Sequence, residues 1–283
     1  MKTISSIREF ICFNQKELIK YEFLLSEKHK ELRLLLEKDS SKNIINESLK
    51  KLISLAYYDL EAIYKHNVEL IKNIFSKMEI NNIPVISIKT IEDGKILDFF
   101  NSNSNNKLNV TSIKSYTGFS EIMNSSEVKY YINNDLEKSF MEKNYKHPKI
   151  KKEALELLKN NKIAWKDCWK NNDEAYSSTL IIPMAIRIKD DDHVLFKEKF
   201  SNKIIHRESN RTVWGFLCFE YLEKNVFSNT EENDIVNTSY IIADILSLYL
   251  MFFYNHISGS KTFNESMKKI NSNEKSFIES FFN

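Results

Sequence analysis

Three segments decide the fold of this chain: YSSTLIIPMAIRI at 176–188, VWGFLCF at 213–219 and FSNTEEND at 227–234. In the first segment apolar residues recur with the two-residue period of a strand. One face of that strand would therefore carry Leu180, Ile182, Met184, Ile186 and Ile188. The second is a short apolar strand, and the third opens a long apolar helix that reaches about residue 255. We therefore expect two antiparallel strands and a helix that packs beside them.

A second helix and hairpin are predicted upstream. Apolar residues repeat at helical spacing between 44 and 78, and residues 83–89 then have the composition of a short strand. The sequence EDGK at 92–95 is a good turn, because glycine tolerates a positive φ and aspartate can bond its own backbone. Residues 96–100 supply a returning strand and 128–132 a third. Together these segments predict an α+β fold.

This series resembles the GAF domain family, most clearly over about 175–257 and more weakly from about residue 48. The resemblance rests on a small-residue pair before a strand containing Pro183, on the Gly215-Phe216-Leu217 strand, and on the aromatic-Ser start of the helix at Phe227. It implies an antiparallel sheet flanked by long helices. It also implies a non-catalytic sensor or regulatory dimerisation module that binds a small molecule and signals to a separate partner.

The chain divides into three expected parts. Residues 1–42 form an amphipathic helix that serves either as a coiled-coil-like dimerisation arm or as a packing arm within its own chain. The GAF-like domain spans 48–257, and it includes a long insertion at 189–211 between the two diagnostic strands. Residues 258–283 follow as a linker and a short amphipathic helix. We expect a homodimer through the long helices and a separate effector protein.

The resemblance implies a ligand pocket between the sheet and the segment 133–175. The aromatic walls of this pocket are expected to come from Phe119, Tyr131, Phe140, Tyr145, Trp165 and Trp169. The polar groups that orient the ligand are expected to be Asp135 and Ser178. The simpler alternative is that these aromatics are plain core and that Asp135 caps the following helix. Some family members fill the pocket with side chains and only dimerise, so a structural adaptor stays open as an alternative.

Composition excludes several classes of protein. The four glycines lie far apart, so a phosphate-binding loop or dinucleotide fingerprint is absent. A net charge of +2 gives no global case for nucleic acid, which we do not expect as a partner, although ten lysines between 138 and 170 keep a nucleic-acid-binding regulator among the alternatives. The three separated cysteines predict no metal site and fit a reducing cytoplasm. No cofactor can be named.

Two further alternatives concern single segments. Some GAF proteins reduce free methionine sulfoxide with a cysteine in the loop before the serine-containing strand, and Cys168 occupies that loop. We regard this as the weakest alternative and do not expect an enzyme. Residues 235–257 are apolar enough to suggest a membrane span, but Asp244 would be costly inside a bilayer. A buried or dimer-forming helix is therefore expected there, without a membrane.

Overall fold

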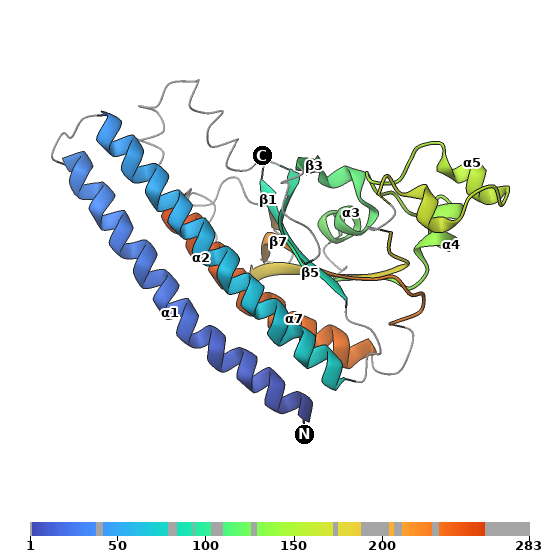
Figure 1. Ribbon diagram of the computed structural model, residues 1–283, viewed down its shortest axis with the longest axis horizontal. Coiled ribbons are helices and arrows are strands. Elements are labelled where there is room, and N and C mark those ends of the chain that lie inside the picture. The colour runs from blue at the N-terminus through green and yellow to red at the C-terminus, as the bar shows by residue number, and fades with distance from the viewer. Residues whose placement is uncertain are drawn as a thin grey trace.

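The computed structural model describes residues 2–37, 42–78, 84–92, 94–102, 110–125, 129–171, 175–187, 204–206, 211–227 and 232–257. These residues form an α+β fold in which long helices lie on one face of an antiparallel sheet (Figure 1). Residues 113–125 and 134–171 lie on the opposite face, and we call them the cover. The fold class expected from the sequence is confirmed.

The sheet places the first and last of its long strands side by side. Its order is β3 (Val110–Ser112), β2 (Lys95–Asn101), β1 (Val85–Glu92), β7 (Arg211–Tyr221), β5 (Ser178–Arg187) and β4 (Tyr131–Asn133). A seventh strand, β6 (Ile204–His206), also pairs with β7. All of these pairs are antiparallel. Chain segments more than a hundred residues apart therefore meet at β1 and β7.

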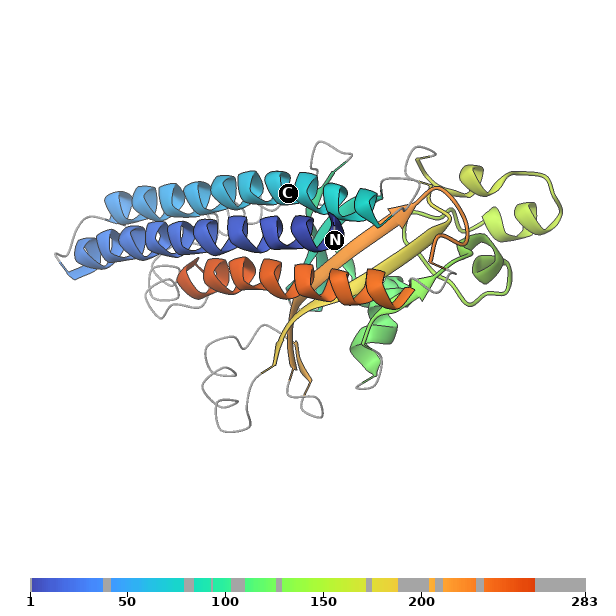
Figure 2. The same ribbon diagram turned by 90° about the horizontal axis from the view of Figure 1, so that it is seen from below.

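Three helices form a layer on one side of the sheet. They are α1 (Lys2–Glu37), α2 (Lys42–Lys77) and α7 (Glu232–Ile257). Figures 1 and 2 show α1 on the outside of this layer, with α2 and α7 between it and the sheet, and the ends of α1 and α2 extending well past the sheet. At 1.5 Å per residue, each 36-residue helix is about 54 Å long.

The main core lies between the helical layer and the sheet. Alternate residues of the strands enter it, among them Leu180, Ile182 and Met184 of β5, as the sequence period predicted. A polar contact joins all three helices inside this apolar region. The Nδ2 of Asn14 donates to Oδ1 of Asn67 at 2.6 Å, and the hydroxyl of Tyr249 donates to Oδ1 of Asn14 at 3.0 Å.

The cover is built from short helices. They are η1 (Ile113–Ser115), α3 (Thr117–Asn124), α4 (Leu136–Met141), α5 (Ala154–Lys159) and η2 (Trp165–Cys168). The first two pack on the sheet, whereas residues 136–169 have a small apolar core of their own. The cover thus has two parts, and they meet where the backbone N–H of Lys146 donates to Oγ1 of Thr117 at 2.8 Å.

Several expected boundaries differ from those observed. The lysine-rich segment from residue 149 becomes helical only at Ala154, because Ile150 forms a bridge to Trp169 and the N–H of Lys151 donates to the carbonyl of Cys168. The strand expected at 128–132 is the short β4, and β3 was not predicted. The insertion, apart from β6 and Arg211 at the start of β7, and the tail at 258–283 lie outside the described residues, so the expectations for them stay predictions.

Helix α7 is long and apolar enough to cross a membrane by length and composition, with a mean hydropathy of 1.6 over Asp234–Phe253. In this fold, however, 56% of that stretch is buried within the protein. Its apolar side chains, including Leu246, Tyr249 and Leu250, belong to the main core. A core helix passes the same composition test, and the packing of α7 against the sheet accounts for its sequence.

Candidate functional site

A buried ion pair lies on the face of the sheet beneath the cover. Lys89 of β1 stands directly opposite Asp98 of β2, and its ammonium group pairs with that carboxylate. Both side chains are largely shielded from solvent. Burial alone would lower the pKa of Lys89, but the neighbouring carboxylates of Asp98 and Glu220 raise it above its ordinary value. Lys89 therefore stays charged although it is buried.

A second carboxylate reaches the same face from β7. Glu220 shares the alternation of Cys218, so both point away from the helices, and it lies opposite Thr179 of β5. Burial raises the pKa of Glu220, while the nearby ammonium groups of Lys89 and Lys149 oppose that shift. The carboxylate is also hydrogen-bonded to the side chain of Tyr176.

Aromatic side chains with polar atoms surround these charges. The ring of His147 lies 4.8 Å from that of Tyr116, 5.8 Å from that of Tyr176 and 6.3 Å from that of Tyr145 between centroids. The side chains of Tyr145 and Tyr176 are hydrogen-bonded to each other. Burial, together with the positive charges of Lys89 and nearby lysines, lowers the pKa of His147 well below its ordinary value. The imidazole is therefore neutral near pH 7.

These groups enclose a cavity that we call the polar hollow. Its lining consists of Lys89, Tyr116, Thr117, Gly118, Phe119, Tyr145, Lys146, His147, Tyr176, Thr179, Ile181 and Glu220. The free volume among them is about 10 Å³, which is about what one water molecule needs. The hollow combines a charged floor on the sheet, an aromatic wall from the cover and very little empty space.

The structure brings two of the sequence-predicted residues to the hollow and places a third next to it. Phe119 and Tyr145 line the cavity. Tyr131 is buried beside it, where its ring packs against Gly118 and its hydroxyl accepts from Nδ2 of Asn133 at 3.1 Å. Phe119 also stacks on Phe216 of β7 at 4.5 Å between ring centroids. The aromatic walls therefore serve both the core and the hollow.

The other predicted aromatics lie behind the hollow. Phe140, Trp165 and Trp169 belong to the core of the cover. Trp165 donates from Nε1 to the carbonyl of Tyr176 at 2.8 Å, and the ring of Trp169 lies 4.7 Å from that of Tyr176. These tryptophans support a residue of the hollow without lining it.

The two polar residues predicted to orient a ligand have other partners. Asp135 caps α4 by accepting from the N–H of Lys138 at 3.0 Å, and its carboxylate pairs with Lys224 at 3.2 Å. Ser178 donates to the carbonyl of Glu223 at 2.7 Å. The capping alternative therefore describes Asp135.

Sequence reasoning missed most of the polar groups of the hollow. They are Lys89, Tyr116, His147, Tyr176 and Glu220, together with Asp98, which pairs with Lys89 from outside the lining. One feature of the sequence could have revealed three of them: each of Lys89, Asp98 and Glu220 interrupts a strand that is otherwise rich in apolar residues. An ionisable residue within such a strand needs a partner on the same face of the sheet.

The buried cysteines are poor nucleophiles in this environment. Cys168 is buried in the core of the cover, where its thiol lies 3.6 Å from the carbonyl of Ala164. Burial raises the pKa of Cys168 to about 11, with a further contribution from Glu137. Burial also raises the pKa of Cys218. A thiolate, which is the reactive form, is therefore rare at both positions near pH 7.

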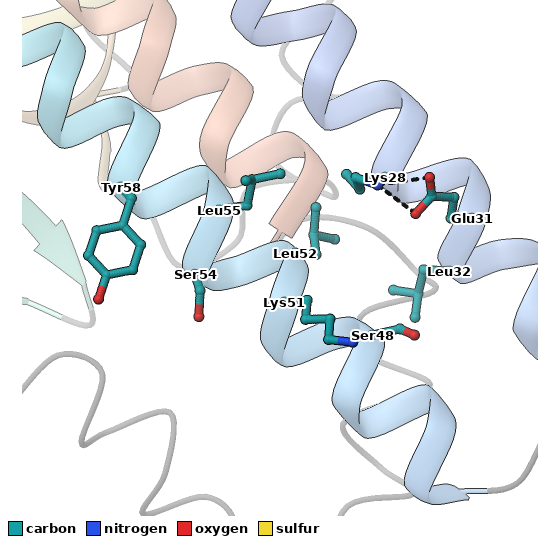
Figure 3. Close-up of a pocket in the computed structure, with 9 residues that line it drawn as sticks. All are labelled: Lys28, Glu31, Leu32, Ser48, Lys51, Leu52, Ser54, Leu55 and Tyr58. Carbon is teal, nitrogen blue, oxygen red and sulfur yellow. Dashed lines mark hydrogen bonds and ion pairs between the residues drawn. The ribbon is translucent and has the colours of Figure 1, made fainter.

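A second cavity lies between the C-terminal part of α1 and the N-terminal part of α2 (Figure 3). It has a volume of about 510 Å³, and its described lining is Lys28, Glu31, Leu32, Ser48, Lys51, Leu52, Ser54, Leu55 and Tyr58. An ion pair between Lys28 and Glu31 borders it. Its charged groups are two lysines and one glutamate near the surface, so it offers weaker recognition chemistry than the polar hollow.

No group of three or more histidine, cysteine or acidic side chains that could hold a metal occurs among the residues that the structure describes. The run of three aspartates at 190–192, followed by His193, falls outside them. The polar hollow is not a typical metal site either, because its lining has one carboxylate, that of Glu220, and the ammonium group of Lys89 lies near it.

Comparison with known proteins gives limited similarity. No family model matches the chain, and no curated protein matches it. A far-red cyanobacteriochrome photoreceptor is 13% identical, with a TM-score of 0.36 over 78% of this chain and 98% of the other. The fRMsr of Staphylococcus aureus in complex with substrate is 11% identical, with a TM-score of 0.32 over 70% and 95% of the two chains. The reduced form of the same fRMsr is also 11% identical, with a TM-score of 0.32 over 70% of this chain and 94% of the other.

Proposed function

We propose that this chain is a non-catalytic, regulatory GAF-type module that binds a small polar molecule in the polar hollow. The observation that carries the proposal is that the charged side chains of Lys89 and Glu220 line a cavity beneath the cover, where Lys89 also pairs with Asp98. Buried ion pairs contribute little to stability, because desolvation of both charges offsets their attraction. Buried ionisable groups with shifted pKa values that gather in a cavity are more typical of binding sites.

The size of the hollow limits its ligand. The free volume of about 10 Å³ admits nothing larger than about one water molecule without rearrangement. A larger ligand requires the two parts of the cover to separate at the contact between Thr117 and Lys146, which consists of two hydrogen bonds of 2.8 and 3.2 Å. We therefore expect a polar ligand to bind only when the cover opens at this contact.

The same strands offer a route from the hollow to the helices. Glu220 faces the hollow, while its neighbour Phe219 points to the opposite side and packs on Phe75 of α2 at 4.8 Å between ring centroids. Likewise Lys89 faces the hollow and Ile88 enters the main core. A ligand that displaces Glu220 or Lys89 would therefore move residues that contact the helical layer. We propose that a separate effector protein reads this change.

We propose binding rather than catalysis because the thiol chemistry open to the chain is disfavoured. The methionine sulfoxide reductase hypothesis depends on Cys168, whose thiol is buried and whose pKa is raised to about 11. It lies outside the lining of the hollow, in the core of the cover. A thiolate at this position would need both exposure and a lowered pKa.

A structural adaptor is the second candidate, and the small free volume of the hollow favours it. In that case the tyrosines and His147 serve as permanent filling, and the buried charges specify one arrangement of the cover on the sheet. The two candidates differ in whether the hollow is ever occupied by another molecule.

Native mass spectrometry of protein purified from its own cells tests the proposal. We expect the wild-type chain to carry an additional mass that is released on denaturation. The variant Glu220→Gln should lose it, because it removes the charge without changing the shape of the side chain. Tyr131→Phe, which changes a buried tyrosine outside the lining, should retain it. No additional mass in wild-type protein, together with no rise of the Tm in a screen of small polar molecules, would support the adaptor and overturn the sensor.

A further inference from the structure

The cover carries most of the positive charge of the protein. Residues 138–170 contain ten lysines and four acidic residues, a net charge of +6, whereas the whole chain has a net charge of +2. The rest of the chain therefore carries −4. None of the ten lysines is buried. The cover lies at the end of the molecule away from the C-terminal end of α1, so the positive charge is concentrated at one end (Figures 1 and 2).

Backbone pairing brings six of these lysines together. Ile150 forms an antiparallel bridge to Trp169, and beside it the N–H of Lys170 donates to the carbonyl of Lys149 at 2.8 Å. Two segments 14 or more residues apart in the sequence therefore lie side by side. We call these two segments, 146–152 and 166–170, the lysine ribbon, and its lysines are Lys146, Lys149, Lys151, Lys152, Lys166 and Lys170.

The bridge also determines which way the side chains point. Ile150 and Trp169 both enter the core of the cover. Because side chains alternate along an extended segment, their neighbours Lys149, Lys151 and Lys170 leave that core on its outer side. The ribbon contains one acidic residue, Asp167, whose carboxylate accepts from the backbone N–H of Ala164 at 3.2 Å. The outer side of the ribbon is therefore strongly positive.

Two of the ammonium groups are held in place by neutral partners. Nζ of Lys151 donates to the carbonyl of Asp167, and Nζ of Lys170 donates to the carbonyl of Pro148, both at 2.8 Å. A carbonyl oxygen orients an ammonium group without neutralising its charge. Groups that are already in position lose less conformational entropy when they bind a partner. The ribbon thus presents ordered positive charges to solvent.

We infer that the lysine ribbon binds the phosphate backbone of a double-stranded nucleic acid without reading its sequence. Lysine acts as a point charge that contacts phosphate oxygens, and such contacts position a protein on a duplex. The ribbon contains none of the arginine, asparagine or glutamine side chains that make bidentate contacts to base edges. Affinity without sequence preference is therefore expected.

The surface around the ribbon favours a duplex over other anionic partners. Among the described residues of the cover, no large apolar side chain is exposed. Single-stranded nucleic acid is bound through exposed aromatic rings, and membrane surfaces through inserted apolar residues. Protein interfaces are enriched in aromatic residues and depleted in lysine. A surface rich in lysine and without exposed rings matches the phosphate backbone of a duplex.

This inference goes beyond ligand binding in the polar hollow and does not depend on it. Lys146 belongs to the ribbon and also lines the hollow, and Lys149 lies close enough to influence the pKa of Glu220. Both residues are therefore left unchanged in the test, so that the hollow keeps its charges.

Fluorescence anisotropy of a short, labelled duplex of mixed sequence, in DNA and RNA forms, tests the inference with the full-length chain. Wild-type protein should bind at about 50 mM NaCl and lose affinity steeply as salt is added. The triple variant Lys152→Gln, Lys166→Gln, Lys170→Gln should bind the DNA duplex about tenfold more weakly or worse. Its slope of log Kd against log salt concentration should be smaller by about 2.7, since each lost phosphate contact removes about 0.9.

A control variant with the same change in net charge shows whether the position of the lysines matters. Lys20→Gln, Lys30→Gln, Lys65→Gln changes three exposed lysines of α1 and α2 and should keep the wild-type slope. Circular dichroism establishes that each variant is folded, and Lys152→Gln, Lys166→Gln replaces the ribbon variant if that one is not.

Four results would overturn the inference. They are no binding of either duplex by the wild type, equal losses in the ribbon and control variants, tighter binding of a single strand of the same sequence, and tighter binding of polyglutamate or of vesicles made from equal parts of phosphatidylcholine and phosphatidylserine. The last two would assign the ribbon to a different anionic partner.

Discussion

Lys89 and Asp98 are direct cross-strand neighbours that form an ion pair with only 9% and 16% of their side chains exposed. Each charge depends on the other, because neither can be hydrated by bulk water. Removal of one partner from such a pair typically costs about 3–5 kcal/mol, whereas replacement of both by apolar residues is often neutral.

We therefore expect Asp98→Leu to lower the free energy of unfolding by about 3 kcal/mol and the double variant Lys89→Met, Asp98→Leu to recover most of that loss. Glu220 can take up a proton in the double variant, because its pKa is already raised by burial. Urea unfolding of the wild type, both single variants and the double variant gives the coupling free energy between Lys89 and Asp98. If the double variant is no more stable than Asp98→Leu, then Lys89 and Asp98 do not depend on each other as an ion pair, contrary to this prediction.

Protonation of His147 predicts a loss of stability in mild acid. The pKa of His147 is held well below its ordinary value by burial and by Lys89, Lys149 and Lys170. The unfolded chain therefore binds a proton below about pH 6.5 that the folded chain excludes. Stability is present above that pH and is lost as the pH falls through the interval down to the lowered pKa.

The Tm of the wild type should accordingly fall more between pH 7.5 and 5.5 than that of His147→Gln. Glu220 acts in the opposite sense, because its raised pKa makes the folded chain bind a proton more readily as the pH falls. A His147→Gln, Glu220→Gln variant separates the two contributions. If the Tm of the wild type and that of His147→Gln fell by the same amount between pH 7.5 and 5.5, then burial would not keep a proton off His147 in the folded chain.

Close approach of β1 and β7 predicts that Gly215 cannot be replaced. A Cβ atom at this position would lie 2.1 Å from the carbonyl oxygen of Lys89, a backbone atom that cannot move alone. Gly215→Ala should cost about 3 kcal/mol or prevent folding, since the strands must separate. Gly94→Ala is the matched control. It has a positive φ of 72° and no neighbour within 4 Å, so its cost should be about 1–2 kcal/mol.

The strands and long helices could be predicted because their apolar periods are local. The alternation of Leu180, Ile182 and Met184 directly gives the face that enters the main core. The cover could not be predicted to the same degree, because its short helices follow from contacts such as the bridge between Ile150 and Trp169. Such contacts join residues that no local period relates.

The polar hollow could not be predicted from the sequence for the same reason. Lys89 and Glu220 lie on neighbouring strands of the sheet, but 131 residues separate them in the sequence (220 − 89). Residue type alone also misled the assignment of polar roles. Asp135 and Ser178 follow the expected pattern of a ligand site, yet both bond to backbone groups nearby in space. Capping and ligand binding use the same oxygen atoms, so only the position of the partner distinguishes them.

The buried thiols give a direct test of the choice between binding and catalysis. Cys168 and Cys218 should react with iodoacetamide at pH 7.5 far more slowly in the folded chain than in urea, because both are buried and the pKa of Cys168 is raised to about 11. Peptide mass spectrometry after timed alkylation measures each site, and the urea-unfolded chain shows that all three cysteines can be labelled. Rapid labelling of Cys168 in the folded protein would mean that its thiolate is accessible. The reductase alternative would then regain the nucleophile that it requires, and the proposal of a purely binding module would fail.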